Sequence, residues 1–362
     1  MTAYYQASTK TLLARKTKLF PQSFSKVPQQ NYRPPYKAFI PLPDMSRRRN
    51  AISHETPDCL VSRIATTHRV RDTVITKEAL DDLAERITSD KRKVAVLVEH
   101  DSTCPPCGMA VNAKVVPLED GHYALDTTSV LYGPPTPVVL PDGTNGFLQS
   151  IPTFPFPLSV GDFGNSVSPE IRIDPANLGG IAEAREFSRA LEAIAPEVGY
   201  RVSDFERRSA IPDPQMIINF GVALSGFLLT AKLGDAAAKA LEPRVKQFLD
   251  VAFESMYRMA VHANPKTRPI TYIFYAHGTP RVSFVVRTRD PHIAIKAMSS
   301  DFSDVSKQVA SLHERFNAEL IQLMLDDDGE WKFSYLVTSD GTVVGSKDSF
   351  DRRAVHIGRL QQ

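Results

Sequence analysis

The stretch of residues 75–126 constrains the fold most strongly, because its hydrophobic pattern changes from helical to extended within a few residues. Apolar residues recur at three- and four-residue steps from Leu80 to Ile87, which predicts an amphipathic helix over 76–89 with Thr76 as its N-cap. The wholly apolar run 94–98 predicts a short strand that is covered on both faces. This part of the chain therefore places a helix directly before a buried strand.

Two further strands are predicted over residues 109–116 and 122–132. They flank the turn Glu119-Asp120-Gly121, where glycine accepts a positive φ. Residues 133–164 are crowded with proline, which predicts a long surface excursion rather than core. A strand resumes over 166–173, with Pro169 indicating an irregular entry.

The C-terminal half begins with residues 180–200 and 216–262, which we predict to be helical. Residues 216–231 are the most apolar run of the chain, and they are shorter than the roughly 20 residues that a membrane span requires. We therefore expect a central core helix there. Hairpins around Gly278-Thr279-Pro280 and at Asp340-Gly341, with a helix over 303–325 between them, predict a small α+β unit.

The predicted fold class is α+β, with four parts along the 362 residues. They are a basic, proline-rich extended arm (1–55), a β-rich, barrel-like domain with one or two helices (56–178, including a proline-rich insert at 133–164), a helical region (179–265), and a C-terminal α+β unit of two hairpins and a helix (266–362).

The N-terminal arm carries ten lysines and arginines within residues 1–50 against a single acid, Asp44. One interpretation is functional: the arm docks on a partner, contacts phosphate or acts as a targeting peptide. The other is that the arm is a solvated linker or an extended segment that lies over a neighbouring domain. It has no continuous apolar region of the kind that a secretory signal needs. The rest of the chain is mildly acidic and shows no nucleic-acid motif. We expect protein partners, through the arm or through homo-oligomerisation, and no transmembrane span.

Three cysteines, Cys59, Cys104 and Cys107, make an odd count in a long chain. This count suits a reducing compartment better than a disulfide framework. We therefore expect a cytoplasmic protein.

Five short motifs share an order with a known family. They read EALDDLAERI, VAVLVEHD, PPCGMAV, LEDGHYAL and SVSPEI, and the region of the match covers about a third of the chain. In this order the chain resembles the phage prohead proteases, the assemblin-like serine proteases that mature capsids. The resemblance implies that His100 is the general base and Ser168 the nucleophile, because a serine hydroxyl attacks an amide only when an imidazole removes its proton. Ser166 competes with Ser168 for this role, and no third member of a triad is identifiable.

The same region has a second interpretation as a zinc site. His100, Cys104 and Cys107 form an H-x3-C-x2-C pattern that Cys59 or His122 would complete as a tetrahedral set. A redox role for the Cys-Pro-Pro-Cys step is disfavoured, because a strand rather than a helix follows it. In a third interpretation His100 only ends a strand.

Two classes of function follow. One is an endopeptidase of limited specificity, or its degenerate descendant, that works through His100 and Ser168. The other is a non-catalytic interaction or assembly protein, with a small structural zinc site as a further option.

Overall fold

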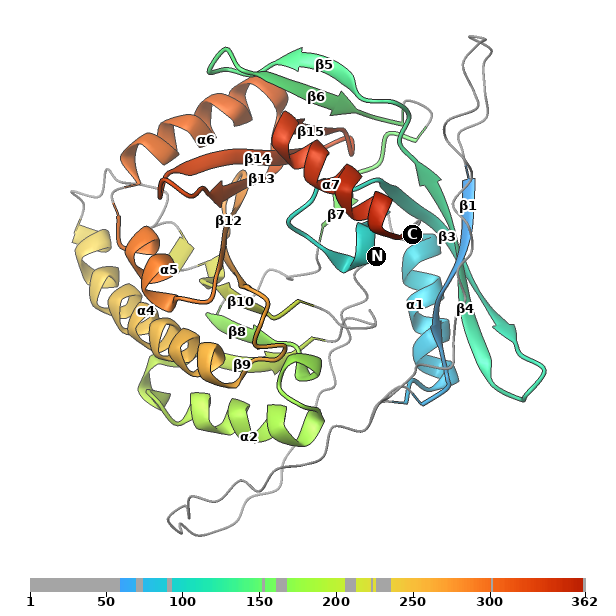
Figure 1. The fold of residues 1–362 in the computed structure, drawn as a ribbon, viewed down its shortest axis with the longest axis horizontal. Coiled ribbons are helices and arrows are strands. Elements are labelled where there is room, and N and C mark those ends of the chain that lie inside the picture. The colour runs from blue at the N-terminus through green and yellow to red at the C-terminus, as the bar shows by residue number, and fades with distance from the viewer. Residues whose placement is uncertain are drawn as a thin grey trace.

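The chain folds as a mixed α+β protein around two β-sheets (Figure 1). This confirms the predicted class at its coarse level. The computed structural model describes residues 59–69, 74–89, 93–151, 154–160, 168–205, 213–222, 224–225, 236–300 and 302–360. The basic arm lies outside these residues.

The smaller sheet has five strands in the order β1-β4-β3-β2-β7. Their bounds are β1 Cys59–Thr66, β4 Tyr123–Leu131, β3 Gly108–Pro117, β2 Lys93–Val96 and β7 Leu158–Ser159. The hairpin β3–β4 turns at Gly121, whose φ of 83° is the left-handed conformation expected of that glycine. Helix α1 (Lys77–Ser89) precedes β2, and the amide of Ala79 donates to Thr76 Oγ1 at 3.3 Å. The predicted helix, its N-cap and the hairpin are confirmed.

The larger sheet has ten strands in the order β5-β6-β15-β14-β13-β12-β11-β10-β8-β9. Their bounds are β5 Thr136–Val139, β6 Asn145–Gln149, β15 Val343–Ser346, β14 Trp331–Thr338, β13 Ala318–Leu325, β12 Arg281–Thr288, β11 Ile270–Ala276, β10 Gln215–Asn219, β8 Glu170–Ile173 and β9 Arg201–Asp204. Strands of this sheet thus come from three of the predicted parts of the chain.

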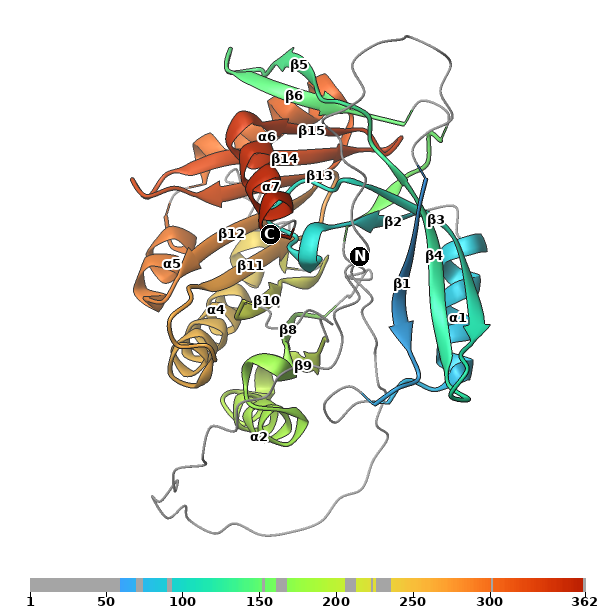
Figure 2. The ribbon, with the colours of Figure 1, turned by 45° about the vertical axis from the view of Figure 1, so that its right-hand side comes forward.

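Three pairs of neighbouring strands in the large sheet are parallel: β8 with β9, β10 with β11, and β12 with β13. A helical connection joins the strands of each pair, as parallel neighbours require. The helices in these connections are α2 (Ile181–Glu192), α4 (Ala236–His262), α5 (Pro291–Met298) and α6 (Ser303–Phe316). All four lie on one side of the large sheet (Figures 1 and 2).

The two faces of the large sheet bury separate cores. Alternate residues of its central strands, such as Ile218 and Phe274, pack with the helices in one cluster. Their neighbours Ile217 and Ile273 pack against the small sheet in another. Helix α7 (Lys347–Leu360) follows β15, and the Cβ that Gly345 lacks would meet its Phe350 side chain. The interface between the sheets is therefore a closed hydrophobic layer with α7 beside it.

Helix α1 covers the opposite face of the small sheet. Leu80 packs there with Ala65 of β1 and Leu125 of β4. Leu125 and Val130 are an odd number of residues apart on β4, so their side chains lie on opposite faces, and Val130 belongs to the core between the sheets. The small sheet is thus covered on both sides, which fits the wholly apolar pattern of its strand β2.

Several predicted elements are wrong. Residues 215–219 form strand β10 where a helix was expected, so the predicted helical region also contains strands β9 and β10. The helix predicted over 303–325 ends at Phe316, and β13 follows Asn317, which has a left-handed φ of 49°. Buried strands with apolar residues on both faces lack the alternation that separates strand from helix.

The proline-rich insert also differs from its prediction as an irregular surface excursion. It contains β5, β6 and β7, with β6 paired to β15 and β7 paired to β2. Pro137 is tolerated because β5 is an edge strand. The insert therefore contributes strands to both sheets.

Candidate metal centre

The connection between β2 and β3, residues 98–107, is called the interface loop below. Glu99 and His100 have consecutive positive φ values of 48° and 60°. Residues other than glycine, asparagine, aspartate and histidine rarely adopt this conformation, so the backbone of Glu99 costs on the order of 1 kcal/mol or more. The loop is thus strained at its start, and the surrounding structure has to hold it there.

Three long side chains hold the interface loop by donating to its carbonyl oxygens. Tyr335 Oη on β14 donates to Ser102 O at 2.9 Å. Gln322 Nε2 on β13 donates to Thr103 O at 3.1 Å. Arg353 on α7 donates through Nη1 to Pro106 O. Because these donors belong to the large sheet and α7, the loop is fixed against both.

Arg353 is a buried cation at this interface. Its second nitrogen, Nη2, donates to Gln149 Oε1 at 2.6 Å, and its guanidinium lies 4.5 Å from the ring centroid of Phe350. Burial lowers the pKa of Arg353 from its ordinary value. The side chain thereby joins α7, the interface loop and β6.

Asp101, Cys104 and His356 form the one group of three potential metal ligands within the part of the chain that the structure describes. Asp101 Oδ2 lies 3.8 Å from Cys104 Sγ and 3.7 Å from His356 Nε2, and all three donor atoms lie within 4.8 Å of one another. Around a tetrahedral zinc ion with ligand distances of about 2.0–2.3 Å, neighbouring donors lie about 3.3–3.6 Å apart. Small side-chain adjustments therefore bring this group to zinc geometry.

The Asp101 carboxylate is already oriented for such a role. Its Oδ1 accepts from the Thr103 amide at 2.9 Å and from Thr103 Oγ1 at 2.6 Å. Its Oδ2 is the atom that faces Cys104 and His356. Hydrogen bonds that fix the outer atoms of a ligand are a regular feature of metal sites.

The electrostatics of Cys104 show which form the thiol takes without a metal. Burial, and next the negative charge of Asp101, raise the pKa of Cys104 to about 12, while Arg352 acts in the opposite direction. The group is therefore a protonated thiol at neutral pH and not an activated nucleophile. Burial raises the pKa of Cys107 as well. Neither thiol has the lowered pKa of a redox-active Cys-x-x-Cys pair, which agrees with the sequence-based argument against that role.

The predicted zinc set of His100, Cys104 and Cys107 does not come together. Only Cys104 belongs to the observed group, whose other members are Asp101 and His356. Cys107 lies at the start of β3 and donates its thiol to Val96 O at 3.3 Å. The two-residue spacing of the cysteines therefore reflects a tight turn into a strand.

The predicted catalytic pair is placed on different sheets. His100 lies in the interface loop after β2 of the small sheet, and Ser168 is an exposed residue just before β8 of the large sheet. A barrel shared by the two residues was the expectation. Endopeptidase activity through His100 and Ser168 stays a prediction.

His356 is the site residue that the sequence did not indicate. It lies on α7, and 255 positions separate it from Asp101 in the chain, so no local spacing links the two. The side chains of His356 and Asp101 are 18% and 20% exposed, which leaves room for a water molecule or another ligand in a fourth position. Both figures show α7 running beside the interface loop (Figures 1 and 2).

Comparison with known proteins adds no further assignment. No protein family, curated protein or solved structure matches this chain. No helix in the described part of the chain is both long enough and apolar enough to cross a membrane.

Proposed function

We propose that the protein binds one zinc-class divalent ion through Asp101, Cys104 and His356, and that this ion stabilises a scaffold for protein interaction. The observation that carries the proposal is the convergence of a carboxylate, a thiol and an imidazole nitrogen within 4.8 Å. Carboxylate oxygen, thiolate sulfur and imidazole nitrogen are the ligand atoms that zinc takes in proteins.

The origin of the three ligands supports a structural role. Asp101 and Cys104 belong to the loop of the small sheet, whereas His356 belongs to α7, which packs on the large sheet. An ion at this point cross-links segments that are distant in the chain. Binding to the folded state alone stabilises it by about 2.7 kcal/mol when the free ion is at 100 times its dissociation constant. This proposal corresponds to the second of the two expected classes, the interaction or assembly proteins.

The proposal is tested with the full chain, purified without chelators, incubated with zinc and freed of excess ion before elemental analysis. The expected result is one zinc per chain in the wild type and its loss in Cys104→Ala and His356→Ala. Cobalt in place of zinc should give a thiolate-to-metal charge-transfer band that Cys104→Ser removes. The exposed Cys59 supplies a matched control, because Cys59→Ser should leave metal content and spectrum unchanged.

Two further variants separate the observed ligand set from the one expected from sequence. Cys107→Ser should retain the metal, because the Cys107 thiol is bonded to Val96 O outside the group. Full metal content in His356→Ala, or loss of metal in Cys107→Ser with the fold intact, contradicts the assignment. A wild-type protein that takes up no zinc contradicts the proposal as a whole.

A serine endopeptidase is the second candidate function. Two observations favour it: Ser168 is exposed directly before β8, and the backbone of His100 is held in the strained left-handed region that is frequent at functional sites. The test is self-cleavage of purified protein, followed by mass spectrometry of the fragments. Cleavage that Ser168→Ala abolishes and Ser166→Ala preserves supports this candidate, and cleavage that survives Ser168→Ala removes it.

A further inference from the structure

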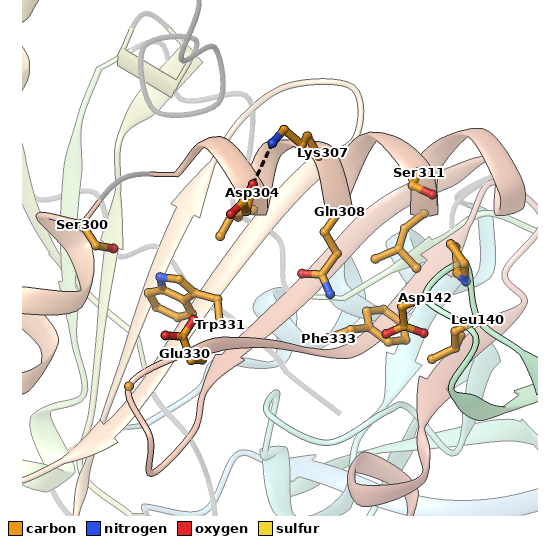
Figure 3. Close-up of a pocket in the computed structure, with 14 residues that line it drawn as sticks. Leu140, Asp142, Ser300, Asp304, Lys307, Gln308, Ser311, Glu330, Trp331 and Phe333 are labelled. Atoms are coloured by element: carbon orange, nitrogen blue, oxygen red, sulfur yellow. Dashed lines mark hydrogen bonds and ion pairs between the residues drawn. The ribbon is translucent and has the colours of Figure 1, made fainter.

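A groove of about 620 Å³ runs between α6, the β5–β6 turn and β14 (Figure 3). Its walls are helix α6 on one side and the turns at Asp142 and Gly329 on the other. The groove shares none of its lining residues with the metal group. It is therefore a separate site that the proposed metal function does not use.

The rim of the groove is acidic. In the part of the chain that the structure describes, the groove lining carries the acids Asp142, Asp304 and Glu330 and a single cation, Lys307. Lys307 Nζ lies 2.7 Å from Asp304 Oδ1, so these two charges offset each other. Among the described residues, neither Asp142 nor Glu330 has a cationic partner. Within that part of the chain, two carboxylates therefore face the groove without a counter-charge.

The floor of the groove is aromatic. Trp331 and Phe333 of β14 lie there, as Figure 3 shows. Trp331 is held in place by Phe284, whose ring centroid is 5.2 Å away in an edge-to-face arrangement. Acidic rims over aromatic floors suit extended, proline-rich and basic peptides, because a polyproline II chain packs its rings on aromatic surfaces and its cations meet the rim.

The chain itself contains a segment of this chemistry. Residues 20–49, FPQSFSKVPQQNYRPPYKAFIPLPDMSRRR, hold six prolines and six basic residues against one acid. The segment lies within the 58 residues that precede β1. Residues 38–58 link Lys37 to β1, and at about 3.3 Å per extended residue this link spans up to about 70 Å.

We propose that a short stretch within residues 20–49 of the arm docks, in an extended conformation, into the groove of the same chain. The arm then covers a surface that partner proteins with basic, proline-rich segments would otherwise occupy. The interaction is electrostatic in part, so it weakens as salt shortens the Debye length from about 10 Å at 0.1 M to about 3 Å at 1 M.

The test uses the full chain and zero-length carbodiimide coupling, which joins lysines to carboxylates that are in contact. The expected products are monomers in which Lys26 or Lys37 is coupled to Asp142 or Glu330, identified by mass spectrometry. The double variant Asp142→Asn/Glu330→Gln should lose these products. The matched control Asp82→Asn/Glu85→Gln on α1, outside the groove, should keep them.

Trp331 gives an independent readout, because it is the only tryptophan in the chain. In the wild type its emission should shift, and its quenching by acrylamide should increase, when salt is raised from 0.1 to 1 M. Charge reversal in the arm (Lys26→Glu, Arg33→Glu, Lys37→Glu) should produce the same change at low salt. Each of three results overturns the proposal. The first is coupling that occurs only between chains, and the second is arm coupling that the groove variants do not reduce. The third is emission and quenching of Trp331 that do not change on charge reversal in the arm.

Discussion

Replacement of Arg353 by alanine should destabilise the protein strongly. The side chain is 8% exposed and donates to Pro106 O and to Gln149 Oε1 at 2.6 Å. Hydrogen bonds from a charged group contribute about 1.5–3 kcal/mol each, and both acceptors would remain buried without this donor. Since the burial that lowers the pKa of Arg353 also costs free energy, part of the loss is recovered. We expect the free energy of unfolding to fall by about 3–5 kcal/mol.

Urea denaturation, followed by circular dichroism and by the emission of Trp331, measures this loss. At about 2 °C per kcal/mol for a protein of this size, the melting temperature should fall by about 6–10 °C. The exposed Arg315 is the control, and Arg315→Ala should change stability by less than about 0.5 kcal/mol. If Arg353→Ala falls within 1 kcal/mol of this control at an unchanged denaturant slope, the reasoning that Arg353 fixes the interface loop is refuted.

Three further predictions follow from single positions. Gly108→Ala should lower the free energy of unfolding by about 2–3 kcal/mol, measured by thermal melting, because the new Cβ would lie 2.3 Å from a carbonyl oxygen of β4. Gly133→Ala is the control and should be near neutral, because the space around Gly133 is open. Iodoacetamide at pH 8 should alkylate the exposed Cys59 in the native protein and spare Cys104, whose pKa is raised to about 12; equal labelling would contradict its burial. Burial lowers the pKa of His277 from its ordinary value of 6.5, so below that pH the unfolded chain binds more protons than the folded chain. The free energy of unfolding should therefore fall as the pH drops below 6.5. His277→Gln should flatten this dependence in denaturation curves between about pH 7 and 5.

Local signals in the sequence were sufficient for helix α1 and for the β3–β4 hairpin of the small sheet. The helix α1 was identified from its period and from Thr76, and the hairpin β3–β4 from the turn at Gly121. In the large sheet the same rules identified the hairpins β11–β12 and β14–β15 but failed at strand β10. Strand β10 is buried along its whole length, so its residues show neither alternation nor a helical stripe.

The candidate site was predictable only in part. The interface loop was recognised as the place where chemistry-bearing residues gather, and Cys104, one of the candidate ligands, belongs to the observed group. Asp101 and His356 were missed as partners of Cys104 because α7 reaches the loop only through tertiary packing, which no sequence spacing encodes. The apparent Cys-x-x-Cys pair instead reflects the turn into β3, where Cys107 bonds to Val96 O.

The hydrogen bonds that hold the interface loop have a consequence for synthesis of the chain on the ribosome. The donors to Thr103, Ser102 and Pro106 lie 219, 233 and 247 positions further along the chain. At about 5–20 residues per second, the loop and the inner face of the small sheet emerge roughly 10–50 s before the strands and helix that cover them. During this interval the strained backbone at Glu99 and His100 has none of these three donors, and the apolar inner face of the small sheet is exposed to water. The nascent N-terminal half therefore lacks these stabilising contacts until α7 has been made.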